Sequence, residues 1–233
     1  MEKLCYLIWR RPGQSPEDLR KRALDELAPQ LVERGARHLK LLLADEHVLP
    51  ARSARLTRLD PPLDGMVSFW LACSDDRGPL EEAIAAHTVR REGYLVVESV
   101  PLPDSRPVAP APARMPGIVM LACLERPGRL SREEWIRRWH HDHKTVALET
   151  QCTFLYVRNT VVWPLTEGAP PYEGIVEEGF PAEAVTDPML WYKAGGSEER
   201  LRQNMGRMIE SCRRFLDLES VESHPLSEYR VEA

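Results

Sequence analysis

Three histidines within four residues are the clearest candidates for chemistry in this chain. His140, His141 and His143 follow Trp135 and Trp139 in one stretch with helical character. At about 100 degrees per residue, His140 and His143 share one face of a helix, whereas His141 points away. Because histidine titrates near neutral pH, one held against indole rings is a candidate general acid or base.

The histidine cluster does not predict a metal site. Zinc pairs on helices use His-x-x-x-His, but His140 and His143 are three residues apart, and no third ligand is evident. The chain also has neither Gly-x-Gly-x-x-Gly nor a phosphate-binding loop, so we expect no cofactor.

Bulk composition is that of a soluble globular protein. The chain has 233 residues, 29% of them charged, and a net charge of -5, which disfavours nucleic acid as a partner. No apolar run is long enough to span a membrane. The five cysteines are scattered and form no Cys-x-x-Cys, so we expect a reducing, cytoplasmic setting without disulfides.

A proline-rich segment divides the chain. Residues 103–116 contain five prolines, a composition typical of extended linkers. We therefore predict a first domain over 1–102, a linker over 103–116 and a second domain over 117–233.

The two domains open alike. The apolar segments 4–13 and 119–128 both end in Arg-Pro-Gly. Ser15 and Ser131 follow, each with acidic residues in the first turn after it, which is typical of a helix N-cap. A strand-turn-helix opening is therefore repeated.

The rest of each half predicts the same order of elements. We expect second strands over 37–43 and 153–159, third strands over 65–71 and 174–180, helices over 79–87 and 197–216, and last strands over 94–100 and 220–224. Each half then reads βαββαβ, the ferredoxin-like unit, which leaves one sheet face open. The predicted fold is α+β: two such units packed as a dimeric α+β barrel pseudo-dimer, with helices outside and a cavity between the sheets.

The second half resembles the EthD family of the dimeric α+β barrel superfamily over about residues 118–230, and the first half resembles a weaker copy over 2–102. The likeness rests on Glu125-Arg126-Pro127-Gly128, Ser131-Arg132-Glu133-Glu134-Trp135, Trp139 to His143, Leu155-Tyr156-Val157-Arg158-Asn159 and Tyr172-Glu173-Gly174-Ile175-Val176-Glu177. The resemblance implies a catalytic role for His143, which closes the first helix, and for Glu177 as its partner. It also implies that Asn159 orients His143 or a substrate oxygen.

The halves differ at these positions. Aligning the two openings places Leu27 opposite His143, and aligning the third strands places Ser68 opposite Glu177. We therefore expect one polar site, in the second half, with the first half as a wall or a packing partner.

Strand alternation supports an inward Glu177. Val176 and Phe180 are apolar and suit the face that packs against the helices, so Glu177, on the other face, points into the barrel. The same alternation places Glu178 on the helix side, where its carboxyl group needs a sheet edge or a basic partner. The alternative is a structural pair or two unrelated polar groups. Further candidates for substrate binding, each with ordinary packing or surface exposure as the alternative, are Asn159, Tyr156, Trp139, His140 and Tyr172.

Two classes of function follow. One is a cofactor-independent enzyme, of cyclase, isomerase or decarboxylase type, that moves protons on a small aromatic or polyketide-like substrate in the barrel cavity. The other is a non-catalytic module that binds a hydrophobic ligand or serves as structure. A haem-binding barrel is a further alternative implied by the superfamily, and the fused pair is also a candidate homodimer.

Overall fold

Among the residues that the structure describes, nine strands form one antiparallel sheet, and eight of them close into a barrel. The computed structural model describes residues 1–107 and 111–231. The barrel order is β2-β3-β1-β4-β7-β8-β6-β9, and β9 pairs back onto β2. The strands are β1 Glu2–Trp9, β2 Arg37–Leu43, β3 Gly65–Leu71, β4 Arg90–Leu102, β5 Ala113–Arg114, β6 Ile118–Leu124, β7 Leu155–Pro164, β8 Gly174–Phe180 and β9 Glu222–Arg230.

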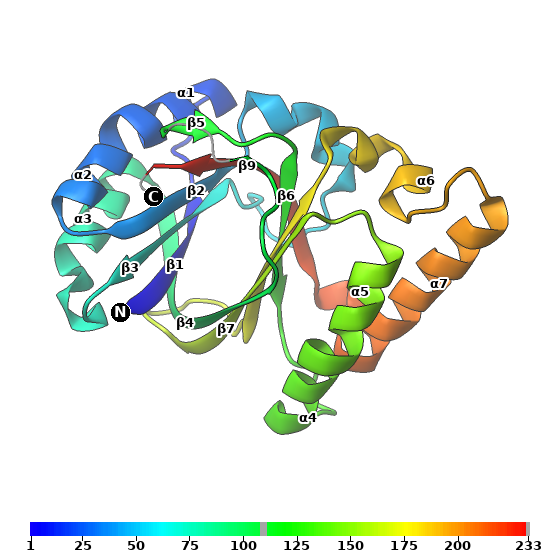
Figure 1. Cartoon of the computed structure of the whole chain (residues 1–233). Helices are drawn as coiled ribbons and strands as arrows, with labels where there is room; N and C mark the ends of the chain where they lie inside the picture. The colour runs from blue at the N-terminus through cyan, green and yellow to red at the C-terminus, as the bar shows by residue number, and fades with distance from the viewer. Residues whose placement is uncertain (108–110, 232–233) are drawn as a thin grey trace.

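The helices lie outside this barrel in two groups (Figure 1). One group covers the strands of the first half, and the other covers those of the second. The helices are α1 Pro16–Arg22, η1 Ala23–Leu27, α2 Ala28–Glu33, α3 Gly78–His87, α4 Arg132–Arg137, η4 Arg138–His143, α5 Lys144–Thr150, α6 Pro188–Trp191 and α7 Glu198–Phe215, with short 3-10 turns η2 Glu46–Ala54, η3 Ser74–Arg77, η5 Ala182–Thr186 and η6 Leu218–Ser220. The predicted α+β class, with a barrel inside and helices outside, is confirmed.

Both halves use the same strand order. The first half runs β2-β3-β1-β4 and the second runs β7-β8-β6-β9, and the ladders β4–β7 and β2–β9 join them. The barrel therefore closes through edge-to-edge pairing of strands from the two halves.

Alternation along each strand separates an inner core from two outer cores. In β1, Cys5 and Leu7 point into the barrel, whereas Leu4 and Ile8 pack against the helices. An eight-stranded barrel is just wide enough for its side chains to fill it. The predicted cavity is therefore not central: the middle of the barrel is packed, and a cavity of about 650 Å³ lies at one end.

The first helix of each half begins and bends at matching positions. The hydroxyls of Ser15 and Ser131 accept hydrogen bonds from the backbone N–H groups of Asp18 and Glu134, as expected of N-caps. Both helices then pass into π-helical segments, η1 and η4, that end at Leu27 and His143. The two serines are 116 residues apart, and so are Leu27 and His143, so the bend falls at the same place in both halves.

Some predicted boundaries are too short. The last strand extends to Arg230 rather than ending at residue 224, and β7 continues to Pro164. The predicted linker 103–116 contains β5, which pairs with β9, while residues 108–110 lie outside the described part. All five cysteines are unpaired. Within the described residues, no helix is both long and apolar enough to cross a membrane.

Candidate functional site

The π-helical segment η4 places His143 between the helices and the outer face of the second-half sheet. The residue is 8% exposed, its ring lies 4.7 Å from that of Phe215, and its Nδ1 lies 3.0 Å from Ser211 Oγ. Burial lowers the pKa of His143 to about 4. The imidazole is therefore neutral at pH 7, with Nδ1 engaged by Ser211.

The wider turn of η4 separates His140 from His143. A π-helix does not keep the 3.6-residue spacing on which the predicted shared face depends. His140 Nε2 lies 3.3 Å from Thr160 Oγ1, and its ring meets that of Trp139 edge-on at 4.6 Å. Burial, with help from Arg158, lowers the pKa of His140 to about 4. His140 therefore lies beside Trp139 and is not among the residues that line the His143 pocket.

A pocket of about 220 Å³ lies beside His143, between the helices and the strands β6, β7 and β8. Trp139 and Tyr156, both expected to bind substrate, line it together with His143. Glu178, the direct cross-strand neighbour of Tyr156, and Phe215, whose ring lies against that of His143, line it as well. We call this space the helix–sheet pocket.

Trp139 is held by close packing on β8. Its indole lies 4.8 Å from that of Trp135 and passes directly over Gly174. A Cβ at Gly174 would lie 2.6 Å from Trp139, closer than real carbon contacts. Glycine is therefore required where the indole covers the strand.

Glu178 is the acidic group of the helix–sheet pocket. Its Oε1 is buried and has no hydrogen-bond partner among the described residues. Burial raises the pKa of Glu178 to about 7. A carboxyl group that exchanges a proton near neutral pH therefore faces the same pocket as a neutral histidine.

Glu177 lies on the opposite face of β8, inside the barrel. Its carboxylate is fully buried, accepts a hydrogen bond from Asn159 Nδ2 at 3.0 Å, and forms ion pairs with Lys3 and Lys40. Burial alone would raise its pKa, but Lys40, Lys3 and Asn159 outweigh it and lower the pKa to about 2. The predicted inward direction agrees with this position.

The structure does not bring His143 and Glu177 together. The helices pack on the outside of the barrel, so a residue of η4 meets only side chains on the outer face of the sheet. Glu177 and Asn159 face inward, and Tyr172 also lies in the barrel core, with its ring 6.1 Å from Tyr94. The expected pairing is therefore corrected: the carboxyl group on the side of His143 is that of Glu178.

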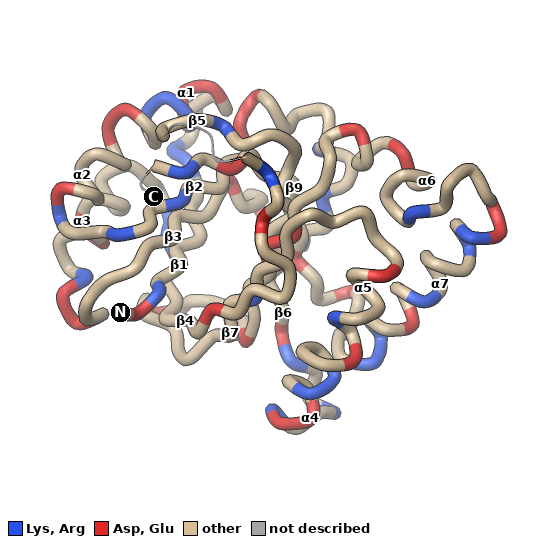
Figure 2. The backbone as a smooth tube through the Cα atoms, viewed as in Figure 1, with Lys and Arg blue, Asp and Glu red and all other residues tan. Residues whose placement is uncertain are grey.

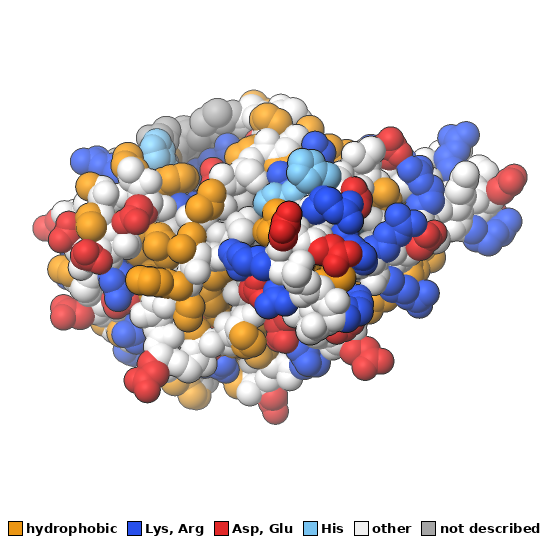
Figure 3. Space-filling view, turned by 90° about the horizontal axis from the view of Figure 1, so that it is seen from below, with side chains coloured by type: hydrophobic (Ala, Val, Ile, Leu, Met, Phe, Trp, Pro, Cys, Tyr) orange, Lys and Arg blue, Asp and Glu red, His pale blue; other side chains and the backbone are white. Residues whose placement is uncertain are grey.

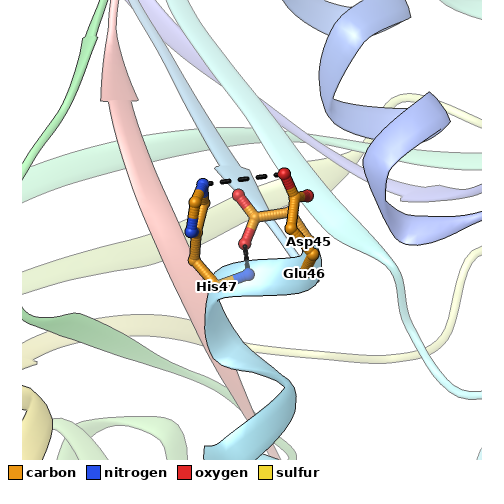
Figure 4. Close-up of side chains that lie close together, drawn as sticks. All are labelled: Asp45, Glu46 and His47. Carbon is orange, nitrogen blue, oxygen red and sulfur yellow. Dashed lines mark hydrogen bonds and ion pairs between the residues drawn. The ribbon is translucent and has the colours of Figure 1, made fainter.

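A second polar cluster, at Asp45, Glu46 and His47, has the residue types of a metal site (Figure 4). Three of its four carboxylate oxygens already accept hydrogen bonds from protein donors, whereas Glu46 Oε2 has no partner among the described residues. Asp45 accepts hydrogen bonds from Ser227 Oγ at 2.8 Å and Tyr229 Oη at 2.6 Å. Glu46 Oε1 accepts from Arg20 Nε at 2.7 Å. This cluster ties η2 to β9 beside the barrel closure.

Sequence reasoning missed four polar residues, two beside His143 and two beside Glu177. Glu178 carried a signal, since alternation placed an acid on the helix side without a partner. Ser211 lies on α7, in the helix predicted from its apolar spacing. Lys3 and Lys40 gave no local signal, because both pair with Glu177, a carboxylate of the other half.

Neither the scan against protein-family models nor the search of curated proteins gives a match to the chain. Solved structures do match. An anthrone oxidase-like protein aligns with a TM-score of 0.52 and 9% identity over 99% of this chain and 91% of its own. A double mutant of chlorite dismutase from Candidatus Nitrospira defluvii aligns with a TM-score of 0.50 and 9% identity over 97% and 91%. At this identity the likeness concerns the fold alone.

Proposed function

We propose that the protein is an enzyme that transfers protons on a small aromatic or polyketide-like substrate bound in the helix–sheet pocket. The observation that carries the proposal is that His143 and Glu178, whose buried Oε1 has no partner among the described residues, line the same pocket. Burial shifts their pKa values in opposite directions, down at His143 and up at Glu178. Titratable groups whose environments separate their pKa values in this way are typical of acid–base sites.

The two groups take different roles. Glu178, with a pKa of about 7, is ionised in a sizeable fraction of molecules at neutral pH and accepts a proton from a carbon next to a carbonyl. His143 stays neutral, and its Nε2 donates a hydrogen bond to the carbonyl oxygen when the ring holds its proton there. Ser211 fixes the ring through Nδ1, and Tyr156 and Trp139 form the wall. This scheme needs no cofactor.

The pocket sets the size of the substrate. Its volume of about 220 Å³ exceeds the roughly 150 Å³ of an engineered cavity that binds benzene. We therefore favour a substrate with one aromatic ring and a short carbonyl side chain. Isomerisation and aldol-type cyclisation of such a compound pass through the enolate that this arrangement stabilises, and loss of CO₂ from its β-keto acid leaves the same enolate.

We also propose that the chain is an EthD-like protein made of two fused ferredoxin-like units. The matched N-caps at Ser15 and Ser131, the matched π-helical bends and the matched strand orders support it. Leu27 stands where the second half has His143, so the acid–base site belongs to the second unit only. Domain boundaries at 102 and 117 fit this division.

A second copy of the chain is the proposed protein partner. At the β4–β7 junction Val97 and Val162 are 61% and 51% exposed, and with Leu95 they line the same surface hollow. Figure 3 looks at the molecule from this side, and its hydrophobic side chains gather on the half away from the arginine-rich helices. Sedimentation velocity of Val97→Asp should show a smaller species than the wild type, whereas Val89→Asp, at another exposed valine, should not.

Exchange of substrate protons with D₂O tests the chemistry without knowledge of the final product. A one-ring aryl ketone is incubated in D₂O, and loss of its α-proton signal is followed by NMR. We expect catalysed exchange by the wild type and a loss of about 100-fold or more in Glu178→Gln. Glu92→Gln changes another buried carboxyl group with a raised pKa, remote from this pocket, and should keep the rate.

Loss of exchange in His143→Gln with retained ketone binding would support catalysis over a ligand-binding role. If no aryl ketone exchanges faster than in buffer while ketones still bind, the non-catalytic alternative is favoured. A Soret band in the purified protein would favour the haem-binding alternative.

A further inference from the structure

The cavity of about 650 Å³ at one end of the barrel is separate from the helix–sheet pocket. The two spaces share no lining residue and lie on opposite faces of the second-half sheet. We call the larger one the barrel-mouth cavity. Its volume lies within the range of roughly 300–1,000 Å³ of small-molecule sites, and it draws its lining from both halves of the chain.

Buried charges form the floor of the barrel-mouth cavity. Lys3 Nζ donates to Glu98 Oε2 at 2.5 Å and to Asn159 Oδ1 at 2.8 Å, and it lies 3.4 Å from Glu177 Oε1. An ammonium group has three N–H donors, so Lys3 is fully used. Lys3 therefore orders the floor but offers nothing further to a ligand.

Lys40 keeps donors that the protein does not use. Its one hydrogen-bond partner among the described residues is Glu177, which it shares with Lys3. Two of its three N–H groups remain, and its side chain keeps 16% exposure on the cavity wall. A ligand can therefore reach a charged donor that the fold has already ordered.

Arg230 stands directly opposite Lys40 across the β2–β9 closure. Paired residues of an antiparallel ladder point to the same face, with their Cβ atoms about 5 Å apart, and two cations so placed repel each other. Arg230 lines the same cavity, and its Nε and Nη2 bind Glu228 and Asp104, which leaves Nη1. An anion between Lys40 and Arg230 removes the repulsion and takes up the remaining donors.

The nearby acids do not compete for this position. Asp104 and Glu228 are held by Arg106 as well as by Arg230. Figure 2 shows that basic and acidic positions both occur on the strands around the barrel. Glu98, the third acid of the lining, is paired with Lys3. Lys40 and Arg230, in contrast, keep N–H donors that no described residue uses.

The remaining wall is mostly apolar, with Trp70, Leu155 and Val157 facing the space. A wall of this kind, with two adjacent cations at one edge, suits a molecule with an apolar body and one carboxylate. We propose that the barrel-mouth cavity binds a small apolar carboxylic acid as its anion, with the carboxylate between Lys40 and Arg230 and the body against Trp70.

Binding of 1-naphthoate, compared with its neutral amide, tests this site. By isothermal titration calorimetry the wild type should bind 1-naphthoate at least tenfold more tightly than 1-naphthamide. Lys40→Met should remove this preference. Lys21→Met, at a lysine exposed on α1 and paired with Glu17, should leave it unchanged.

A double variant controls for misfolding of the single variant. Lys40→Met alone leaves Glu177 with less compensation, whereas Lys40→Met with Glu177→Gln removes both charges of the pair. The double variant should also lose the tenfold preference. In NMR spectra, 1-naphthoate should shift the indole N–H signal of Trp70 and leave that of Trp139 in place, which separates this site from the helix–sheet pocket.

The proposal is overturned by absent naphthoate binding, by equal affinity for the amide, or by full preference in the folded double variant. A shift of Trp139 in place of Trp70 overturns it as well. None of these outcomes bears on proton exchange at Glu178, which is measured separately.

Discussion

Glu177 and Glu178 are neighbours in β8, yet their carboxyl groups lie on opposite faces of the barrel wall and in opposite electrostatic settings. Lys40 and Lys3 hold the pKa of Glu177 at about 2, whereas burial without a cation raises that of Glu178 to about 7. At neutral pH one is a permanent anion, and the other exchanges its proton.

Replacing Glu178 should stabilise the protein in alkali. Its raised pKa means that the folded state binds this proton more tightly than the unfolded chain, so the stability contributed below pH 4.5 is lost as pH rises through about 7. Glu178→Gln should exceed the wild type by up to about 3 kcal/mol at pH 8 and match it near pH 4.5. Urea unfolding at both pH values measures this. Glu183→Gln, at an exposed acid, should show no such pH dependence.

Replacing His143 should protect the protein in acid. Because the pKa of His143 is lowered in the folded state, the unfolded chain takes up this proton at a higher pH than the folded protein. The free energy of unfolding should therefore fall by up to about 3 kcal/mol as pH falls from 6.5 to about 4. His143→Leu, which introduces the residue found at Leu27 in the first half, should lose less stability than the wild type over this pH range. The midpoints of urea unfolding at pH 7 and pH 4.5, compared between the wild type and His143→Leu, measure this difference. An equal acid loss in His143→Leu and in the exposed control His141→Leu would refute the buried, neutral state.

Gly174→Ala should disturb the pocket wall. The added methyl group meets the indole of Trp139 at 2.6 Å, and overpacking of this kind costs about 1–3 kcal/mol. Gly128→Ala, where nothing lies within 4 Å of the new carbon, is the matched control. Thermal unfolding of the two variants should differ, and similar midpoints would mean that the indole moves aside freely.

Asp45→Asn should loosen the closure of the barrel. The Asp45 carboxylate is buried and accepts hydrogen bonds from Ser227 and Tyr229 of β9, and bonds to a charged group contribute about 1.5–3 kcal/mol. Chemical denaturation should show a loss of about that size. The exposed Asp25→Asn should leave stability within about 0.5 kcal/mol.

The sequence predicted the elements well because their signals are local. The serine caps, the strand glycines and the apolar spacing of α7 each act within one element. The last strand was underestimated because Pro225 is a residue that strands avoid and Glu228 is typical of an exposed segment, whereas in the closed barrel both are buried.

The candidate site was predicted less well because it depends on which face of the sheet each element covers. Alternation correctly turned Glu177 inward, but a helix outside the barrel cannot deliver His143 to it. The π-helical bend also changes the phase of the helix, which a 3.6-residue period does not anticipate. Lys40 and Arg230 meet only across the β2–β9 ladder, which no local pattern encodes.

The pH dependence of α-proton exchange in wild type and Glu178→Gln tests the central claim most directly. If Glu178 is the base, the wild-type rate rises with pH and levels off above its pKa of about 7, because only the carboxylate accepts the proton. Glu178→Gln should be slower by about 100-fold or more and should lack this step, while Glu92→Gln keeps it. A wild-type profile that is flat between pH 5.5 and 8.5, or one retained in Glu178→Gln, would contradict the account.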